Sequence, residues 1–304
     1  MFKNGDVICM LGDSITASGF WGAEIYQTIG ATTDVKFFNC GVSGNTADRA
    51  TKYLYHYCLA KNPDYVTVMF GVNDIDRGKL SASYTGTDAR EKVAEAIARH
   101  ATKTEQIIKE IIAYGATPIL CTAPPYDEYN ERETENLKCD YALEECAENV
   151  RALAKKYNCP LIDFREEMLK IMLSHKPIGS DRVHPNLRGY HMMAQIFLEQ
   201  IGFINEKNYD SEFVLEEWNA KRREAEISLK RLDYIDYNRC FERGLANDWG
   251  EAEKIADCRA FLETSTAAAN TFMRECSEFY IENARKRKAF TDELVKYSIY
   301  PRKQ

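Results

Sequence analysis

The chain has 304 residues, 45% of them hydrophobic, and a formal net charge of -7 at pH 7. A chain of this length can bury a sizeable core and is typical of one or two domains. The acidic balance argues against nucleic acid as a partner, because phosphate binding favours a basic face. The polar residues 1–6 are unlike a signal peptide, and no run approaches the roughly 20 apolar residues of a membrane span. We therefore expect a cytoplasmic protein without a membrane partner.

Short apolar runs alternate with helical patterns along the first two thirds of the chain. Five runs predict buried strands: 7–11, 35–38, 65–70, 117–122 and 160–164. The clearest helix between them is predicted over 88–114, with Gly115 as its stop. Alternation of strand and helix predicts an α/β fold, in which helices cover both faces of a doubly wound parallel sheet.

Polar residues follow several of these strands. Gly-Asp-Ser, ending at Ser14, follows the first run, Gly44 lies after the second, and Asn73 lies after the third. Open α/β sheets bind ligands at the carboxyl ends of their strands. Far downstream, Asp181 and His184 form an Asp-x-x-His-Pro segment. Each segment alone is a weak signal, because Gly-Asp-Ser is often a turn and Asp-x-x-His arises by accident, but their joint occurrence favours a reactive site.

The residue types are those that ester cleavage through a serine requires. A serine hydroxyl is a poor nucleophile until a base removes its proton, which a neutral imidazole does near neutral pH. A carboxylate on the other ring nitrogen fixes the tautomer, and Asp181 is close enough in sequence to reach that nitrogen of His184. The oxyanion that then forms needs fixed hydrogen-bond donors. The Gly-x-Ser-x-Gly elbow of α/β-hydrolases is absent at Ser14.

These four segments, in this order, resemble the SGNH (GDSL-type) hydrolase family, and bacterial carbohydrate esterases most. The resemblance covers residues 5–203 and implies a three-layer, flavodoxin-like five-stranded sheet with strand order 2-1-3-4-5. It implies an acyl-enzyme on Ser14, with His184 as base and Asp181 as its orienting carboxylate. It further implies an oxyanion hole made of the backbone N–H groups of Ser14 and Gly44 and the side-chain amide of Asn73.

The substrate is less defined by the sequence. Aromatic and polar residues near the reactive segments are predicted substrate contacts. They are Asp13, Trp21, Asp74, Arg77, Tyr84 and Tyr126. About half of the aromatic ones are expected to be packing residues instead. That mixture suits a sugar, and the loop 81–86 is short for a long acyl chain. We therefore expect a short-chain acyl ester, acetyl foremost, on a carbohydrate. A lysophospholipase or thioesterase-type acyl hydrolase remains an alternative, as does a non-catalytic protein with a vestigial site and an interaction tail.

The ten cysteines are scattered and form no Cys-x-x-Cys pair. Cys9, Cys40 and Cys121 fall in or beside predicted strands, where a free cysteine behaves as a small hydrophobe. Cys139 and Cys146 are seven apart on a predicted helix without a histidine nearby. Free thiols in a reducing compartment are therefore favoured over disulfides or zinc. The proposed chemistry requires neither a metal nor another cofactor.

The last third of the chain changes character. We expect an SGNH hydrolase domain over 1–204 and an α-helical extension over 205–304, with one apolar stripe between Val214 and Leu232 that includes Trp218. Such a stripe must cover another surface, either the α/β domain or a second subunit, and we favour a homo-oligomer. A lid over the Ser14 cleft and a separate partner-binding module are the alternatives. The basic run 285–288 lies among glutamates and predicts a solvated helix face.

Overall fold

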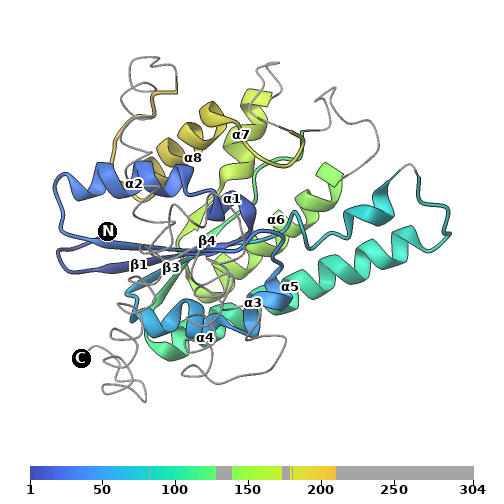
Figure 1. The fold of residues 1–304 in the computed structure, drawn as a ribbon, viewed down its shortest axis with the longest axis horizontal. Coiled ribbons are helices and arrows are strands. Elements are labelled where there is room, and N and C mark those ends of the chain that lie inside the picture. The colour runs from blue at the N-terminus through green and yellow to red at the C-terminus, as the bar shows by residue number, and fades with distance from the viewer. Residues whose placement is uncertain (82, 128–138, 173–178, 180, 210–304) are drawn as a thin grey trace, which may run out of the picture.

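The computed structural model describes residues 1–81, 83–127, 139–172, 179 and 181–209. Five strands form one sheet in this part of the chain (Figure 1). They are β1 (Val7–Gly12), β2 (Lys36–Gly41), β3 (Tyr65–Met69), β4 (Thr117–Cys121) and β5 (Leu161–Ile162). Every neighbouring pair is parallel and the order is β2-β1-β3-β4-β5. The predicted doubly wound sheet and its flavodoxin-like order are confirmed.

Helices cover both faces of the sheet (Figure 1). One layer holds α1 (Ser14–Ala17), α2 (Phe20–Gly30), α7 (Phe164–Met172) and α8 (Leu187–Gln200). The other holds α3 (Ala47–Thr51), α4 (Leu54–Tyr57), α5 (Ala89–Tyr114) and α6 (Cys139–Tyr157). Two short 3-10 helices, η1 (Leu59–Lys61) and η2 (Arg77–Leu80), lie in the connections. The helix predicted over 88–114 is confirmed as α5, and Gly115 ends it in a left-handed conformation with φ 101°.

Strand β1 lies inside the sheet, between β2 and β3, and is buried along its whole length. Because successive side chains of a strand point to opposite faces, Ile8 and Met10 enter the core beneath α2 and α8. Cys9 and Leu11 enter the core beneath α3, α4 and α5. A strand buried on both faces explains why this run is apolar at every position instead of alternating.

The first three strands end at the same edge of the sheet. Gly12 of β1 pairs with Gly41 of β2 on one side and with Met69 of β3 on the other. The segments that carry Ser14, Gly44 and Asn73 leave the sheet directly after these paired residues. Strand register therefore gathers three candidate site segments that are far apart in the chain.

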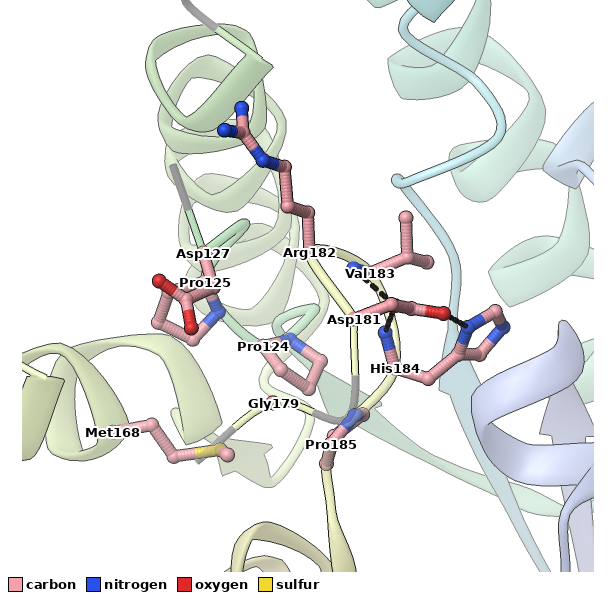
Figure 2. A pocket seen from close by; sticks show the side chains of 10 residues that line it. All are labelled: Pro124, Pro125, Asp127, Met168, Gly179, Asp181, Arg182, Val183, His184 and Pro185. Carbon is pink, nitrogen blue, oxygen red and sulfur yellow. Dashed lines mark hydrogen bonds and ion pairs between the residues drawn. The ribbon is translucent and has the colours of Figure 1, made fainter. Parts of the chain in front are cut away.

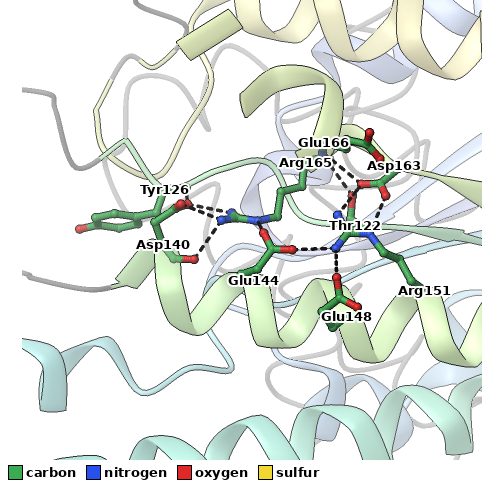
Figure 3. A network of polar contacts seen from close by, with 9 residues as sticks. All are labelled: Thr122, Tyr126, Asp140, Glu144, Glu148, Arg151, Asp163, Arg165 and Glu166. Atoms are coloured by element: carbon green, nitrogen blue, oxygen red, sulfur yellow. Dashed lines mark hydrogen bonds and ion pairs between the residues drawn. The ribbon is translucent and has the colours of Figure 1, made fainter. Parts of the chain in front are cut away.

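A network of ion pairs joins the segment after β4 to α6 and α7 (Figure 3). Arg165 of α7 is 2% exposed, and its guanidinium donates to both carboxylate oxygens of Asp140, at 2.7 Å each, and to Glu144. Asp140 also accepts the backbone N–H of Tyr126 at 2.8 Å. A buried guanidinium needs such partners, because leaving one of these charges unpaired is strongly destabilising. The network fixes the position of Tyr126 relative to the start of α6.

The predicted extension begins inside the described residues but lies almost wholly outside them. Residues 205–209 are described and lie against α8, where Lys207 forms ion pairs with Glu199 at 2.6 Å and with Glu167 of α7 at 3.1 Å. The apolar stripe from Val214 and the side chain of Trp218 lie outside the described residues. Among the helices that are described, none combines the length and apolarity needed to cross a membrane.

Candidate active site

Ser14 is the first residue of α1, directly after β1. The carboxylate of Asp13 accepts the backbone N–H of Ile15 at 2.9 Å and so caps this helix. Helix α1 passes very close to the end of β2, where a Cβ on Gly41 would lie 2.3 Å from the backbone nitrogen of Ala17. Glycine at position 41 therefore permits the tight strand-to-helix turn that presents Ser14.

The side chain of Ser14 meets a histidine from the far end of the domain. Its Oγ lies 2.9 Å from Nε2 of His184. Nδ1 of the same ring lies 2.8 Å from Oδ2 of Asp181 (Figure 2). With the carboxylate as acceptor, Nδ1 carries the proton of a neutral ring and Nε2 is positioned to accept the serine proton. The structure thus brings together the three residues predicted as nucleophile, base and orienting carboxylate.

The Asp-x-x-His turn is stabilised by hydrogen bonds to its own aspartate. Oδ1 of Asp181 accepts the backbone N–H groups of Val183 and His184, both at 2.6 Å, while Oδ2 holds the ring (Figure 2). Burial acts to raise the pKa of Asp181, but these hydrogen bonds outweigh it and lower the pKa below its ordinary value. The carboxylate is therefore ionised at neutral pH, as stabilisation of an imidazolium requires.

Gly44 and Asn73, which the family resemblance implies as hydrogen-bond donors to the oxyanion, lie after β2 and β3. Gly44 has φ 72°, in the left-handed region that favours glycine, and a Cβ there would meet no atom within 4 Å. The amide of Asn73 is held at both ends: its Nδ2 donates to the Asn45 carbonyl at 3.0 Å and its Oδ1 accepts from Arg77 at 3.3 Å. Since an amide NH₂ carries two hydrogens, one is left for an oxygen in the site.

Asp13 and Asp74 were predicted as substrate contacts, but both carboxylates are buried supports. Asp13 is 2% exposed, and burial is the largest cause that raises its pKa to about 7, with the negative charge of Asp74 adding to it and the Ile15 N–H opposing it. Asp74 accepts the backbone N–H of Ala47 at 2.9 Å, at the start of α3, and burial raises its pKa. These residues hold the backbone around Ser14 and Gly44.

Trp21 and Tyr126 were also predicted as substrate contacts, but the structure buries both side chains. The side chain of Trp21 is fully buried and packs on Phe164 and Phe197, with ring centroids 5.3 and 5.9 Å apart. Tyr126 is 1% exposed. Nearness in sequence to a reactive segment does not distinguish an aromatic residue of the core from one that faces a substrate.

The remaining two predicted contacts lie on the side of Asn73. Arg77 is partly buried and reaches Asn73, so its guanidinium supports the amide of the site. The Tyr84 hydroxyl donates to Asp88 and accepts from Lys79, whose ammonium also lies 4.3 Å from the ring centroid. The hydroxyl of Tyr84 is therefore hydrogen-bonded to Asp88 and Lys79 near the start of α5.

A groove beside His184 contains residues that the sequence analysis did not single out for the site. It has a volume of about 400 Å³ and is lined by Phe20, His184, Pro185, Asn186, Leu187 and Tyr190. The rings of Phe20 and Tyr190 lie 4.8 Å apart at 56°. The sequence signal that could have identified Leu187 as a groove residue is its position directly after His-Pro-Asn. Behind the turn, by contrast, the residues of Figure 2 enclose only about 10 Å³, room for one water molecule.

Among the described residues, one group of thiols is arranged so that it could hold a metal ion. The Sγ atoms of Cys9, Cys40 and Cys58 all lie within 4.8 Å of one another, and all three residues are buried. Burial is the main cause that raises the pKa of the Cys9 and Cys58 thiols, which disfavours the thiolate form that metals bind. Of the cysteines that the structure describes, none forms a disulfide.

Comparisons with known proteins identify a family and relatives of this chain. A model of the GDSL-like lipase/acylhydrolase family matches residues 8–197. An acetylxylan esterase from Geobacillus stearothermophilus is 24% identical over 224 residues, which cover 66% of this chain and 95% of that protein.

Solved structures give the same picture of the fold. A gut microbial diltiazem-metabolizing enzyme has a TM-score of 0.60 and 26% identity, over 67% of this chain and 48% of that one, so the chain spans about half of its length. A catalytic mutant of the Geobacillus acetylxylan esterase has a TM-score of 0.57 and 23% identity, over 68% of this chain and 99% of that one.

Proposed function

Because the chain belongs to the GDSL-like lipase/acylhydrolase family, and thereby to the carboxylic ester hydrolases, we propose that it is a serine esterase that removes short acyl groups, acetyl foremost, from carbohydrates. The observation that carries this proposal is the continuous line of contacts from Ser14 through His184 to Asp181. This order of contacts, from serine to histidine to aspartate, supports acyl transfer to a serine.

The reaction proceeds in two halves. As Ser14 Oγ attacks the ester carbonyl carbon, Nε2 of His184 takes its proton, and Asp181 stabilises the imidazolium. The tetrahedral intermediate collapses when the same proton passes to the alcohol oxygen, which leaves as the free alcohol. Water then attacks the acyl-enzyme with His184 again as base, and the carboxylic acid departs while Ser14 regains its proton.

The negative charge of the intermediate falls on the former carbonyl oxygen. The backbone N–H groups of Ser14 and Gly44 and the second amide hydrogen of Asn73 are the proposed donors to it. Donors held in place before the reaction stabilise that charge without reorganisation. The two contacts that hold the Asn73 amide, to Asn45 and Arg77, support this role.

The relatives support the choice of substrate class. One of them is named an acetylxylan esterase, which makes an acetylated carbohydrate the first candidate. Three structures of that esterase are described as catalytic mutants in which a serine, an aspartate or a histidine is replaced by alanine. The replaced aspartate and histidine stand three residues apart there, as Asp181 and His184 do here. A long-chain acyl hydrolase is the competing proposal, which the family's name keeps open.

The nucleophile is tested by substitution and labelling. Ser14→Ala should abolish hydrolysis of p-nitrophenyl acetate without added metal and should block labelling by a serine-directed phosphonate. The exposed Ser83 offers a matched control, so Ser83→Ala should keep both activity and labelling. Undiminished labelling of the Ser14→Ala variant contradicts the assignment.

The acyl group is tested by a chain-length series of p-nitrophenyl esters, from acetate to decanoate, beside a panel of acetylated sugars. Each CH₂ buried in an accommodating pocket contributes about 0.8 kcal/mol, so a site for long chains should favour longer esters clearly. We expect a preference for acetate and release of acetate from the sugars. A steady rise toward decanoate favours the lipid or thioester alternative.

We also propose a cytoplasmic location and a homo-oligomeric state. Free, buried thiols such as Cys9 and Cys121 suit a reducing compartment. Cell fractionation tests the location, and light scattering of the purified full-length protein tests the oligomeric state.

A further inference from the structure

The groove beside His184 is mostly apolar. Phe20 contributes a partly exposed aromatic ring that packs on Tyr190, which is 3% exposed, Pro185 adds apolar surface, and Leu187 is 38% exposed at its edge. An exposed leucine at the first position of a helix, over an open groove of about 400 Å³, is unusual for a core-facing element. That volume falls within the range of small-molecule sites.

The reaction geometry determines which half of an ester faces this groove. His184 Nε2 must deliver its proton to the alcohol oxygen, so that oxygen lies within hydrogen-bond distance of the imidazole. The groove includes His184 among its lining residues and includes neither Gly44 nor Asn73, the proposed donors to the carbonyl oxygen. The half of the substrate that extends from the imidazole into the groove is therefore the alcohol.

The groove suits a ring that has both an apolar and a polar side. Pyranose rings present C–H groups on their faces and hydroxyl groups at their edges, and aromatic, proline and leucine surfaces accommodate the C–H faces. Asn186 adds a polar side chain beside His184, and this side chain caps α8: its Oδ1 accepts the Gly189 N–H at 2.9 Å and its Nδ2 donates to the Gly179 carbonyl at 3.4 Å. A long acyl chain would belong to the other half of the ester.

We propose that Phe20 and Leu187, supported by the buried Tyr190 behind Phe20, form the subsite for the alcohol half of the ester, and that its occupant is a pyranose ring. This inference rests on the proposed function and specifies its substrate. Leu187 determines how well a bulky alcohol binds, whereas a small alcohol such as ethanol does not reach it. The acyl group is selected elsewhere in the site.

Binding without turnover is the first test. In the Ser14→Ala background, methyl tri-O-acetyl-β-D-xylopyranoside is titrated by calorimetry into the protein with and without Leu187→Ala. Loss of part of a leucine contact should weaken binding by about 5- to 10-fold. Ile112 is 43% exposed on α5, in the opposite helix layer, so Ile112→Ala is the matched control and should leave the affinity unchanged. Equal affinity in all three proteins, or none in any, overturns the subsite.

Kinetics with native Ser14 give the second test. Leu187→Ala should lower kcat/KM for the acetylated xylopyranoside by about 5- to 10-fold through KM and leave ethyl acetate unchanged. The ratio of ethyl acetate to ethyl butyrate hydrolysis should also stay unchanged. A changed acetate-to-butyrate ratio with no dependence on the alcohol makes the groove an acyl site and overturns the proposal. Activity that survives Ser14→Ala contradicts the proposed function, and the subsite is then judged from the calorimetric affinities alone.

Discussion

Asn73 is held by Asn45 and Arg77, and we propose that the second hydrogen of its amide binds the oxyanion. The oxyanion exists only along the reaction path, so a donor to it affects turnover and not ground-state binding. Asn73→Ala should therefore lower kcat by on the order of 100-fold or more with little change in KM. Steady-state kinetics on p-nitrophenyl acetate check this, and a rise in KM alone makes Asn73 a binding contact.

Arg77 is predicted to act through Asn73 instead of through the substrate, because its guanidinium donates to Asn73 Oδ1. The residue before it, Asp76, has a left-handed backbone with φ 51°, which turns the chain at this point. Arg77→Gln should lower kcat by about 10-fold, the effect of roughly one charge-assisted hydrogen bond.

A double-mutant cycle separates the two roles of Arg77. If the guanidinium only positions the amide, Arg77→Gln has no further effect in the Asn73→Ala background. An effect that persists there, mainly in KM, shows a direct contact with the substrate.

Asp13 gives the protein a stability that depends on pH. Its buried carboxyl has a pKa of about 7, raised from 3.8, so burial of the ionised form destabilises the fold increasingly as the pH rises from about 4 to 7. Asp13→Asn removes this titration while keeping an oxygen for the Ile15 N–H. The variant's stability relative to the wild type should grow by on the order of 2 kcal/mol between pH 5 and pH 8. Urea unfolding measures it, with the exposed Asp34→Asn as control.

The contacts among Ser14, His184 and Asp181 were predictable because reactive chemistry requires particular side chains in fixed local settings, a strand end and a short turn. Trp21 and Tyr126 were not, because the direction in which an aromatic side chain points depends on packing between elements distant in sequence. The groove residue Tyr190 was missed for the same reason: it belongs to the apolar face of α8, and only the tertiary structure brings it beside Phe20.

At the scale of elements, the contact between α1 and β2 requires glycine at position 41. A Cβ there would lie 2.3 Å from Ala17 N, which is backbone and cannot move aside as a flexible side chain could. Gly41→Ala should displace α1, lower the melting temperature and reduce esterase activity more than 10-fold, in line with the sensitivity of catalysis to small displacements.

Gly30 provides the control, since it ends α2 and a Cβ there meets nothing within 4 Å. Gly30→Ala should leave activity unchanged and stability within about 0.5 kcal/mol of the wild type. Equal behaviour of the two variants contradicts the close-approach argument.

Most elements could be predicted from pattern because strands and helices here differ clearly in period. The central strands are continuous apolar runs, and α5 has a helical apolar face with a glycine stop. Boundaries were less accurate: the second strand was predicted over 35–38 but runs over Lys36–Gly41, since Asn39 and Gly41 are polar or small yet buried beside α1. The fifth strand has two residues, Leu161–Ile162, because it pairs only with β4 at the edge of the sheet.

At the scale of the whole molecule, residues 205–209 pack against the α/β domain. Both ring nitrogens of the buried His191 face acceptors, Glu24 at 2.9 Å and the Asn208 carbonyl at 2.9 Å, which requires the protonated ring. Burial lowers the pKa of His191, but the Glu24 contact outweighs it and raises the pKa above 6.5. This contact therefore stabilises fully below about pH 6.5 and is lost as the pH rises through the raised pKa.

Two truncations test that boundary. A chain ending at Tyr209 should keep the contacts of Lys207 and Asn208, whereas one ending at Phe203 loses them and should unfold at a lower temperature. The difference should be larger at pH 6 than at pH 9, because the His191 contact needs the proton. Thermal unfolding of both proteins at both pH values measures it, and identical melting temperatures place the boundary before residue 204.

The contact between Ser14 and His184 joins residues 170 positions apart in the chain. During synthesis Ser14, the proposed nucleophile, leaves the ribosome early, and β1 can pair with β2 and β3 while His184, the proposed base, is still untranslated. A nascent chain is therefore unable to cleave esters until its α/β domain is almost complete. In refolding, recovery of hydrolysis should lag behind recovery of secondary structure, so esterase activity reports the last docking step of this domain and not the formation of its central sheet.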